Sequence, residues 1–220
     1  MDGKAMKTPS KRPFAMPTKA MALVVALEWD AQIRVIETST MPVTMLAATA
    51  LDVTPLRRDA TVTELLRYLV TDLVCFPLAE DDAVDEEDLS LAEKQAQLWQ
   101  QPIAHFTGTY GPISIASARD LTPPKHSEKA MSMARKRLEG MSDWELTSAL
   151  SLAQGCKSLI VPLGVLDGAV PVDKALAAAR AEEDHQIQHW GLVEGGHDVD
   201  LANVKTQVLA ALLLTRLSKP

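Results

Sequence analysis

The segment TVTELLRYLVTDLVC, residues 61–75, carries leucines at positions 65, 66, 69 and 73. This spacing places the leucines on one face of a helix and predicts that the face is buried. Thr61 and Glu64 have the spacing of a capping box, in which each side chain bonds to the other residue's backbone nitrogen, so we expect the helix to begin there. Helical patterns dominate after this segment, and we therefore predict a domain boundary between residues 56 and 57.

On the N-terminal side of this boundary, two short stretches are predicted to be extended. Residues 4–8 and 14–16 are flanked by turn-forming residues, and Pro17 closes the second stretch. This pattern predicts a small antiparallel sheet. Residues 1–4, Met-Asp-Gly-Lys, are typical of the turn of a hairpin whose first strand is missing, so we expect that an N-terminal piece was removed or left out. Two helices are predicted next, at residues 18–33 and 41–52.

The remainder of the chain is predicted to be almost wholly helical. Seven of the nine residues 80–88 are acidic, and their mutual repulsion predicts an exposed loop. Residues 108–117 are predicted to form a returning strand, because Ile113 and Ile115 alternate with other residues. Further helices are predicted to begin at Ser90, at Ser127, and near Asp198 or Asp200. One more is predicted from Ser142, with Glu145 as a capping box, to Asp167 with a kink at Pro162, and another from Pro171 to Trp190.

Composition excludes several classes of protein. A chain of 220 residues with 47% apolar residues can bury a core without help. The net charge of -7 argues against broad binding of nucleic acid, which needs a dominant basic face. The longest apolar runs, residues 20–27 and 208–214, fall short of the roughly twenty residues that span a bilayer. Cys75 and Cys156 are far apart in helical runs, so we expect no disulfide and a reducing compartment.

The segment EEDHQIQH, residues 182–189, is the nearest approach to a catalytic motif. His185 and His189 are four residues apart and share a helix face, and His197 with Asp198 could add ligands for zinc. A metal-dependent enzyme that uses this cluster is therefore one alternative function. However, Gln186 follows the first histidine where a metalloprotease needs a glutamate as general base. We expect a hydrated helix face, with no bound metal and no cofactor.

Other catalytic motifs are missing from the sequence. No serine, cysteine or threonine lies in a strand-turn-helix elbow, and no glycine-rich segment is followed by the Lys-Ser or Lys-Thr pair of a phosphate loop. We therefore predict no catalytic residue and no small-molecule substrate. Trp29 and Trp190 are predicted to be structural residues, and Gly191 is predicted to stop the helix that precedes it. A general helical scaffold is the second alternative function.

Several segments, taken in their order along the chain, are similar to one known family. They are MDGKAMKTP at residues 1–9, MPT at 16–18, EWD at 28–30, MPVT at 41–44, RYLVTDLVC at 67–75 and EEDHQIQHWGLVEGGHD at 182–198. This series resembles the mitochondrial ATP synthase assembly factor 2 family, and it looks closest to plant-type members. His185 and His189 depart from the family pattern, which has an aromatic or aliphatic residue and a charged residue at these positions.

The resemblance implies both a fold and a function. The implied fold is α+β, with a small N-terminal antiparallel-sheet domain at residues 1–56 and a C-terminal orthogonal helical bundle at residues 57–220. The implied function is that of a chaperone in the mitochondrial matrix, which binds the unassembled alpha subunit of ATP synthase and gives it up to the beta subunit. On this basis we expect acidic contacts to the client from Glu182, Glu183, Glu194 and Asp198. The expected partner is a protein, without nucleic acid or a membrane span.

Overall fold

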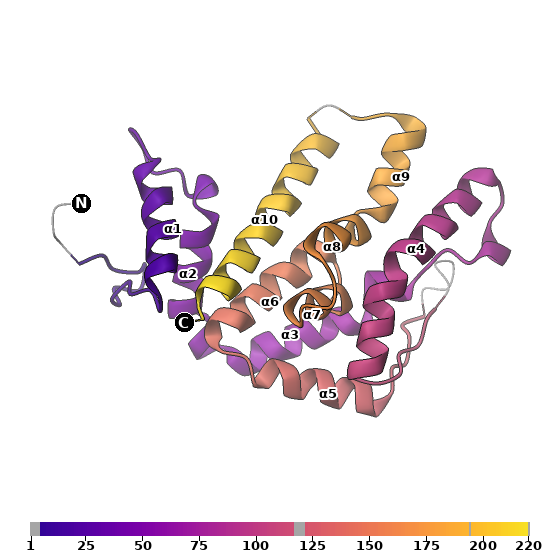
Figure 1. Ribbon diagram of the computed structural model, residues 1–220, viewed down its shortest axis with the longest axis horizontal. Helices are drawn as coiled ribbons and strands as arrows, with labels where there is room; N and C mark the ends of the chain where they lie inside the picture. Colours follow the sequence, from indigo (N-terminus) through magenta and orange to yellow (C-terminus); the bar gives the residue numbers. More distant parts are fainter. Residues whose placement is uncertain (1–4, 117–121, 194, 220) are drawn as a thin grey trace.

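The computed structural model describes residues 5–116, 122–193 and 195–219, and these residues are arranged as helices (Figure 1). The longer helices are α1 Lys19–Asp30, α2 Pro42–Asp52, α3 Arg58–Val70, α4 Glu86–Thr109, α5 Glu128–Glu139, α6 Asp143–Cys156, α7 Ile160–Leu166, α8 Val172–Ala179, α9 Ala181–Trp190 and α10 His197–Leu217. Short 3-10 helices are η1 Thr38–Thr40, η2 Thr54–Leu56, η3 Leu73–Cys75 and η4 Glu80–Asp82. No helix within the described ranges combines the length and apolarity needed to cross a bilayer.

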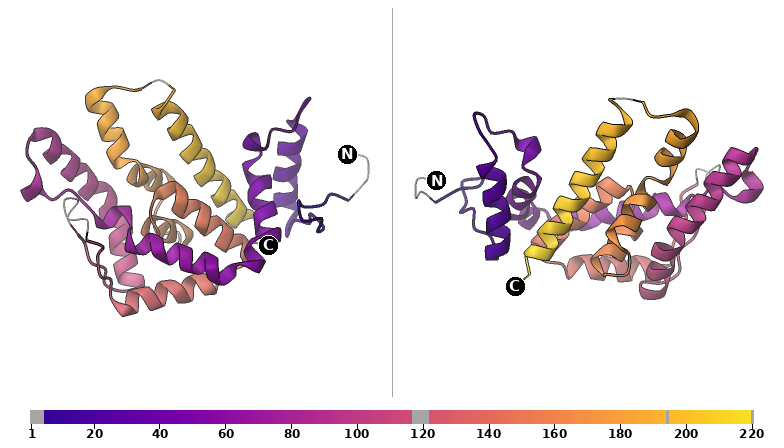
Figure 2. Two further views of the ribbon diagram at one scale, coloured as in Figure 1. Left: turned by 180° about the vertical axis from the view of Figure 1, so that it is seen from behind. Right: turned by 45° about the horizontal axis from the view of Figure 1, so that its top comes forward.

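Helix α6 is the centre of the structure. It packs against α2, α3, α7, α8 and α10, and both further views keep it between these neighbours (Figure 2). Small residues such as Ala149 and Ala153 let the surrounding helices approach closely, and both are buried. The helix begins with the predicted capping box, in which Ser142 and Glu145 bond to each other's backbone nitrogens. It ends at Lys157, whose left-handed backbone (φ 51°) turns the chain away.

The larger hydrophobic core lies under α3 to α8, with a contribution from α10. Trp99 and Phe106 of α4 are among its largest fully buried side chains. The indole Nε1 of Trp99 donates a hydrogen bond to the carbonyl oxygen of Ala178 at 2.9 Å, so this tryptophan ties α4 to α8. Cys75 and Cys156 are free thiols in the structure, and both are buried.

A second, smaller core joins α1 and α2 to the C-terminal half of α10. Its buried side chains are Met21, Val25, Val43, Ala47, Ala210 and Leu214. The carboxylate of Glu28 accepts hydrogen bonds from the backbone nitrogens of Val43 (2.9 Å) and Thr44 (2.7 Å), so α1 caps the first turn of α2. Helix α10 therefore contributes to both cores. The domain boundary at residues 56 and 57 stays a prediction.

The predicted N-terminal sheet is wrong, and with it the α+β fold class, because the described residues are all-helical and contain no strand. The predicted strands meet only in one isolated antiparallel bridge, between Lys7 and Pro13. Pro13 has no backbone N–H, and the chain reverses at Lys11, which has a φ of 65°. A two-stranded pairing this short needs a further strand to become a sheet, and the described chain supplies none. Residues 1–4, predicted to form a hairpin turn, lie outside the described residues.

Three predicted helices have different boundaries in the structure. The helix predicted from Ser142 to Asp167 is broken at Lys157, before Pro162, and α7 is a separate helix. The helix predicted from Pro171 to Trp190 is broken at Arg180, which separates α8 from α9. The capping box predicted at residues 61 and 64 is wrong, because α3 begins at Arg58. Gly191 ends α9 with a φ of 85°, as predicted for a helix stop.

The acidic segment and the returning strand also differ from prediction. The side chain of Asp85 accepts a hydrogen bond from the backbone nitrogen of Asp88 and starts α4 at Glu86, so the helix does not wait for Ser90. Acidic residues are favourable in a first helical turn because the N-terminal N–H groups carry partial positive charge. Helix α4 extends to Thr109, and residues 111–116 form no strand.

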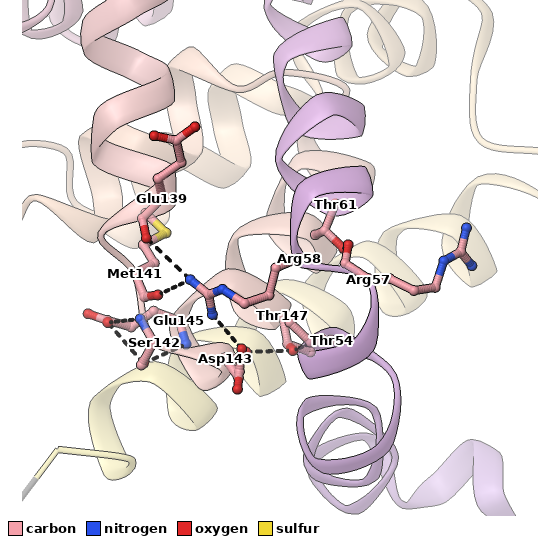
Figure 3. Close-up of polar contacts among 10 residues, drawn as sticks. All are labelled: Thr54, Arg57, Arg58, Thr61, Glu139, Met141, Ser142, Asp143, Glu145 and Thr147. Atoms are coloured by element: carbon pink, nitrogen blue, oxygen red, sulfur yellow. Dashed lines mark hydrogen bonds and ion pairs between the residues drawn. The ribbon is translucent and has the colours of Figure 1, made fainter.

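A polar junction fixes α3 against the turn between α5 and α6 (Figure 3). Arg58 pairs with Asp143 and also donates to the carbonyl oxygen of Met141 at 2.7 Å. Nearby, the hydroxyl groups of Thr54 and Thr147 lie 2.6 Å apart and are buried. These contacts join the end of the N-terminal segment to the central helix. They account for the start of α3 at Arg58, ahead of the predicted cap.

A buried carboxylate ties the end of α3 to the start of α7. Asp72 is fully buried, and it accepts hydrogen bonds from the backbone nitrogens of Val74, Leu159 and Ile160. Burial raises the pKa of its carboxyl to about 6, while these bonds and one from Ser158 oppose the rise. The carboxylate satisfies the first N–H groups of α7, which would otherwise lack partners in the core.

Candidate functional site

Helices α9 and α10 are consecutive along the chain, and the end of α9 and the start of α10 lie at the top of Figure 1. We call residues 190–193 and 195–201 the tip. Large apolar side chains are exposed there: Trp190 by 74%, Val193 by 60%, Leu192 by 57%, Val199 by 50% and Leu201 by 45%. Single exposed apolar residues are common on protein surfaces, but several within one short segment are typical of surfaces that bind other proteins.

The tip is held in place by a buried arginine. Arg180, at the break between α8 and α9, is only 2% exposed. Its guanidinium group pairs with Asp184 in the first turn of α9 and with Asp200 in the first turn of α10. A planar guanidinium can bond two carboxylates at once, so Arg180 sets how α9 and α10 diverge.

Two of the predicted client-binding acids have partners within the protein. Glu182 accepts a hydrogen bond from Nε2 of Gln95 on α4 at 3.0 Å. Burial, and then the neighbouring Glu183, raise the pKa of Glu182, whereas Lys157 and Gln95 lower it. Glu183 forms an ion pair with Lys157. Both acids therefore hold α9 against the bundle and are only partly available to a partner.

Of the other two predicted acids, the structure describes only Asp198, which belongs to the tip. Asp198 is exposed in the first turn of α10 and pairs with no cation among the described residues. Glu194 lies outside the described residues. The structure therefore brings Glu182 and Glu183 together on α9, and it places Asp198 beside the exposed apolar residues. The contact of these four acids with a client stays a prediction.

The two predicted structural tryptophans have different environments. Trp29 is half-buried and packs against the smaller core, and it lines an apolar pocket of about 300 Å³ together with Phe14 and Met41. Its indole Nε1 is buried without a partner among the described residues. Trp190 is mostly exposed and is not a core residue. Trp99 has that internal role instead.

The histidines of α9 form a cluster with a residue that sequence reasoning missed. His185 and His189 have ring centroids 4.2 Å apart, and Glu87 of α4 completes the group. Burial lowers the pKa of His185, with further lowering from His189 and Lys94 and an opposing effect from Glu87. His197 and Asp198 are not part of this cluster. The pair four residues apart was visible in the sequence, but Glu87 lies 98 positions before His185 and carries no local signal.

Comparison with known proteins finds a matching family model and two fungal relatives of this chain. Residues 1–107 match a family model described as ATP12 chaperone protein. Protein atp12, mitochondrial, from Schizosaccharomyces pombe is 26% identical over 98% of this chain and 76% of its own length. Protein ATP12, mitochondrial, from Saccharomyces cerevisiae is 24% identical over 97% of this chain and 76% of its own length.

Solved structures of bacterial proteins are also similar to this chain. The crystal structure of Atp12 from Paracoccus denitrificans matches with a TM-score of 0.85 and 26% identity, over 99% of this chain and 90% of that chain. A protein from Agrobacterium tumefaciens matches with a TM-score of 0.88 over 100% of this chain and 79% of its own, and at 24% identity it shows the fold alone. This helical protein with an exposed apolar tip is similar to these proteins over nearly its whole length. The match of residues 1–107 and the similarity to these relatives confirm the resemblance to the ATP12 chaperone family that the sequence indicated.

Proposed function

We propose that this chaperone acts in ATP synthase assembly, binds the unassembled alpha subunit and delivers it for assembly with the beta subunit. Similarity to the ATP12 family supports the role in assembly. The mitochondrial names of the two fungal relatives support action in the mitochondrion, and we propose the matrix as the compartment. In this proposal the protein binds a client and transforms no substrate.

The exposed apolar tip is the observation that carries the proposal. An alpha subunit made ahead of its neighbours exposes an apolar interface, which aggregates unless another apolar surface covers it. Trp190, Leu192 and Val193 supply such a surface on one side of the turn, and Val199 supplies it on the other.

In this proposal the acidic residues orient the docking of the client. Asp198 is unpaired within the described chain and is free to meet a basic group on the client. Glu183 is bound to Lys157, whose side chain is largely exposed, and an exposed ion pair exchanges partners at a cost of about 1 kcal/mol or less. Charges at the rim of an interface mainly speed and orient docking. We propose that Asp198 and Glu194 act first, with Glu182 and Glu183 as secondary contacts.

Co-expression with the alpha subunit alone tests the proposal. We expect the wild-type chaperone to keep the alpha subunit soluble and to copurify with it. A tip variant, Trp190→Ser with Leu192→Ser, is expected to lose this capture while it keeps the wild-type unfolding temperature. Leu56→Ser is the matched control, because Leu56 is equally apolar and 71% exposed but lies in η2, outside the tip.

Three outcomes of this experiment each contradict a different part of the proposal. Capture by the tip variant at the wild-type level contradicts the docking surface. Equal capture of many unrelated aggregation-prone proteins contradicts the alpha-subunit client and favours the general scaffold. Loss of capture in Leu56→Ser as well as in the tip variant contradicts a contact confined to the tip.

A further inference from the structure

Helices α4 and α9 pack side by side and bring three metal-ligand side chains together (Figure 1). Glu87 comes from the first turn of α4, and His185 and His189 come from successive turns of α9. One candidate ligand atom from each residue lies within 4.8 Å of the other two. Oε1 of Glu87 is 4.0 Å from Nδ1 of His189.

His185 provides a second, independent observation. Its side chain is only 3% exposed, yet neither ring nitrogen has a hydrogen-bond partner among the described residues. Leaving a buried polar group unpaired is unfavourable, so buried imidazoles in native proteins normally have a partner. A ligand in the cluster satisfies one of these nitrogens.

We propose that Glu87, His185 and His189 bind one divalent transition-metal ion, for which Zn²⁺ is the best match. Zinc takes imidazole nitrogen at about 2.0–2.1 Å and carboxylate oxygen at about 2.0–2.2 Å. In tetrahedral geometry such ligands are about 3.4 Å apart, so the three atoms need to close by at most about 1.4 Å. Glu87 lies on a long side chain in a half-exposed position and can make most of this movement.

The spacing on α9 also suits a metal. Two histidines four residues apart lie on the same helix face and can bind one ion without a change of backbone. Nδ1 of His189 lies 3.0 Å from the carbonyl oxygen of His185. This contact orients the imidazole ring of His189, as outer-shell partners of metal-bound histidines do.

The bound ion would hold α9, the helix that leads into the tip, against α4. It joins the first turn of α4 to α9, which otherwise meet through Glu182 with Gln95 and Gln188 with Lys94. Three protein ligands leave a fourth tetrahedral position for water or for a group from a bound partner. The site differs from the cluster suggested by sequence alone, because it uses Glu87 in place of His197 and Asp198.

Zinc titration of the full chain tests this inference. The protein is purified without a histidine tag, treated with a chelator and titrated with ZnCl₂ in a calorimeter. We expect one zinc ion per chain and a higher unfolding temperature in its presence. Glu87→Gln and His189→Gln are each expected to weaken binding by about tenfold or more. His185→Phe is expected to abolish the site while it keeps the fold, because a phenyl ring fills the buried position without unpaired polar atoms.

The matched control is His197→Gln, which removes a histidine of the same segment outside the cluster. It is expected to bind zinc as the wild type does, and Co²⁺ bound to both proteins is expected to give the same visible absorption bands. Unchanged zinc affinity in His185→Phe and His189→Gln overturns the proposal. So does a wild-type protein that binds no zinc, or a His197→Gln variant that loses it.

Discussion

The carboxylate of Asp72 lies 2.7 Å from the backbone nitrogen of Leu159, which joins the segment after α3 to the segment before α7. This buried carboxylate also serves the nitrogens of Val74 and Ile160. Asp72→Ala leaves three buried N–H groups without partners, and we expect it to lower the free energy of unfolding by about 3 kcal/mol or more. Urea unfolding measures the loss. Asp59→Ala, at an exposed position in the first turn of α3, is the control, and an equal loss in both variants contradicts this role.

The same carboxylate predicts a dependence of stability on pH. The pKa of Asp72 is raised by burial from its usual 3.8 to about 6. Between these pH values the folded protein holds a proton that the unfolded chain has released, so the stability contributed by this group decreases as the pH rises. Relative to Asp72→Asn, the free energy of unfolding is expected to fall by about 3 kcal/mol between pH about 3.8 and about 6, and to stay level above that range. A difference between the two proteins that is constant with pH contradicts the raised pKa.

The two tryptophans outside the main core are expected to respond differently to mutation. Trp29 packs against the smaller core, so Trp29→Ala is expected to cost about 3 kcal/mol, and Trp29→Arg is expected to lower solubility as well. Trp190 is mostly exposed, so Trp190→Ala is expected to change stability by about 0.5 kcal/mol or less. Thermal and urea unfolding of both variants check this. A fully stable Trp29→Arg protein contradicts the packing of Trp29.

Charge reversal at the tip tests the steering of the client. Asp198→Lys is expected to slow association with the alpha subunit by about tenfold at low salt, and added salt is expected to reduce the effect. Asp173→Lys makes the same change in charge at an exposed position in the first turn of α8, away from the tip. Stopped-flow measurement of association gives both rates. Equal slowing in the two variants indicates an effect of net charge alone.

Of two capping boxes predicted from the sequence, one marks the start of a helix in the structure and the other does not. Ser142 and Glu145 form their capping box as predicted, and Lys219 also pairs with Glu145 at 2.9 Å. Thr61 and Glu64 have the same spacing but lie inside α3, where the Thr61 hydroxyl donates to the carbonyl oxygen of Arg57. The ion pair of Arg58 with Asp143, 85 residues away, favours the earlier start. A sequence window of a few residues cannot contain that contact.

The candidate site was predictable only where its features are local in the sequence. The acidic segment and the spacing of His185 and His189 are local, and they were identified from the sequence. The ion pair of Glu183 with Lys157 and the place of Glu87 beside the histidines depend on how α9 packs against the bundle. The predicted sheet failed because its residues were assigned by turn signals alone, and the part of the chain that the structure describes supplies no third strand beside Lys7 and Pro13.

Ala210 and Leu214 bring the C-terminal half of α10 into the smaller core, so α1 and α10 depend on each other although they lie far apart in the sequence. Helices α1 and α2 cannot complete their core until α10 has packed against them. Until then, Met21 and Val25 lack their final neighbours and leave apolar surface exposed to aggregation. A chain truncated before residue 210 therefore loses contacts at both ends of the fold at once.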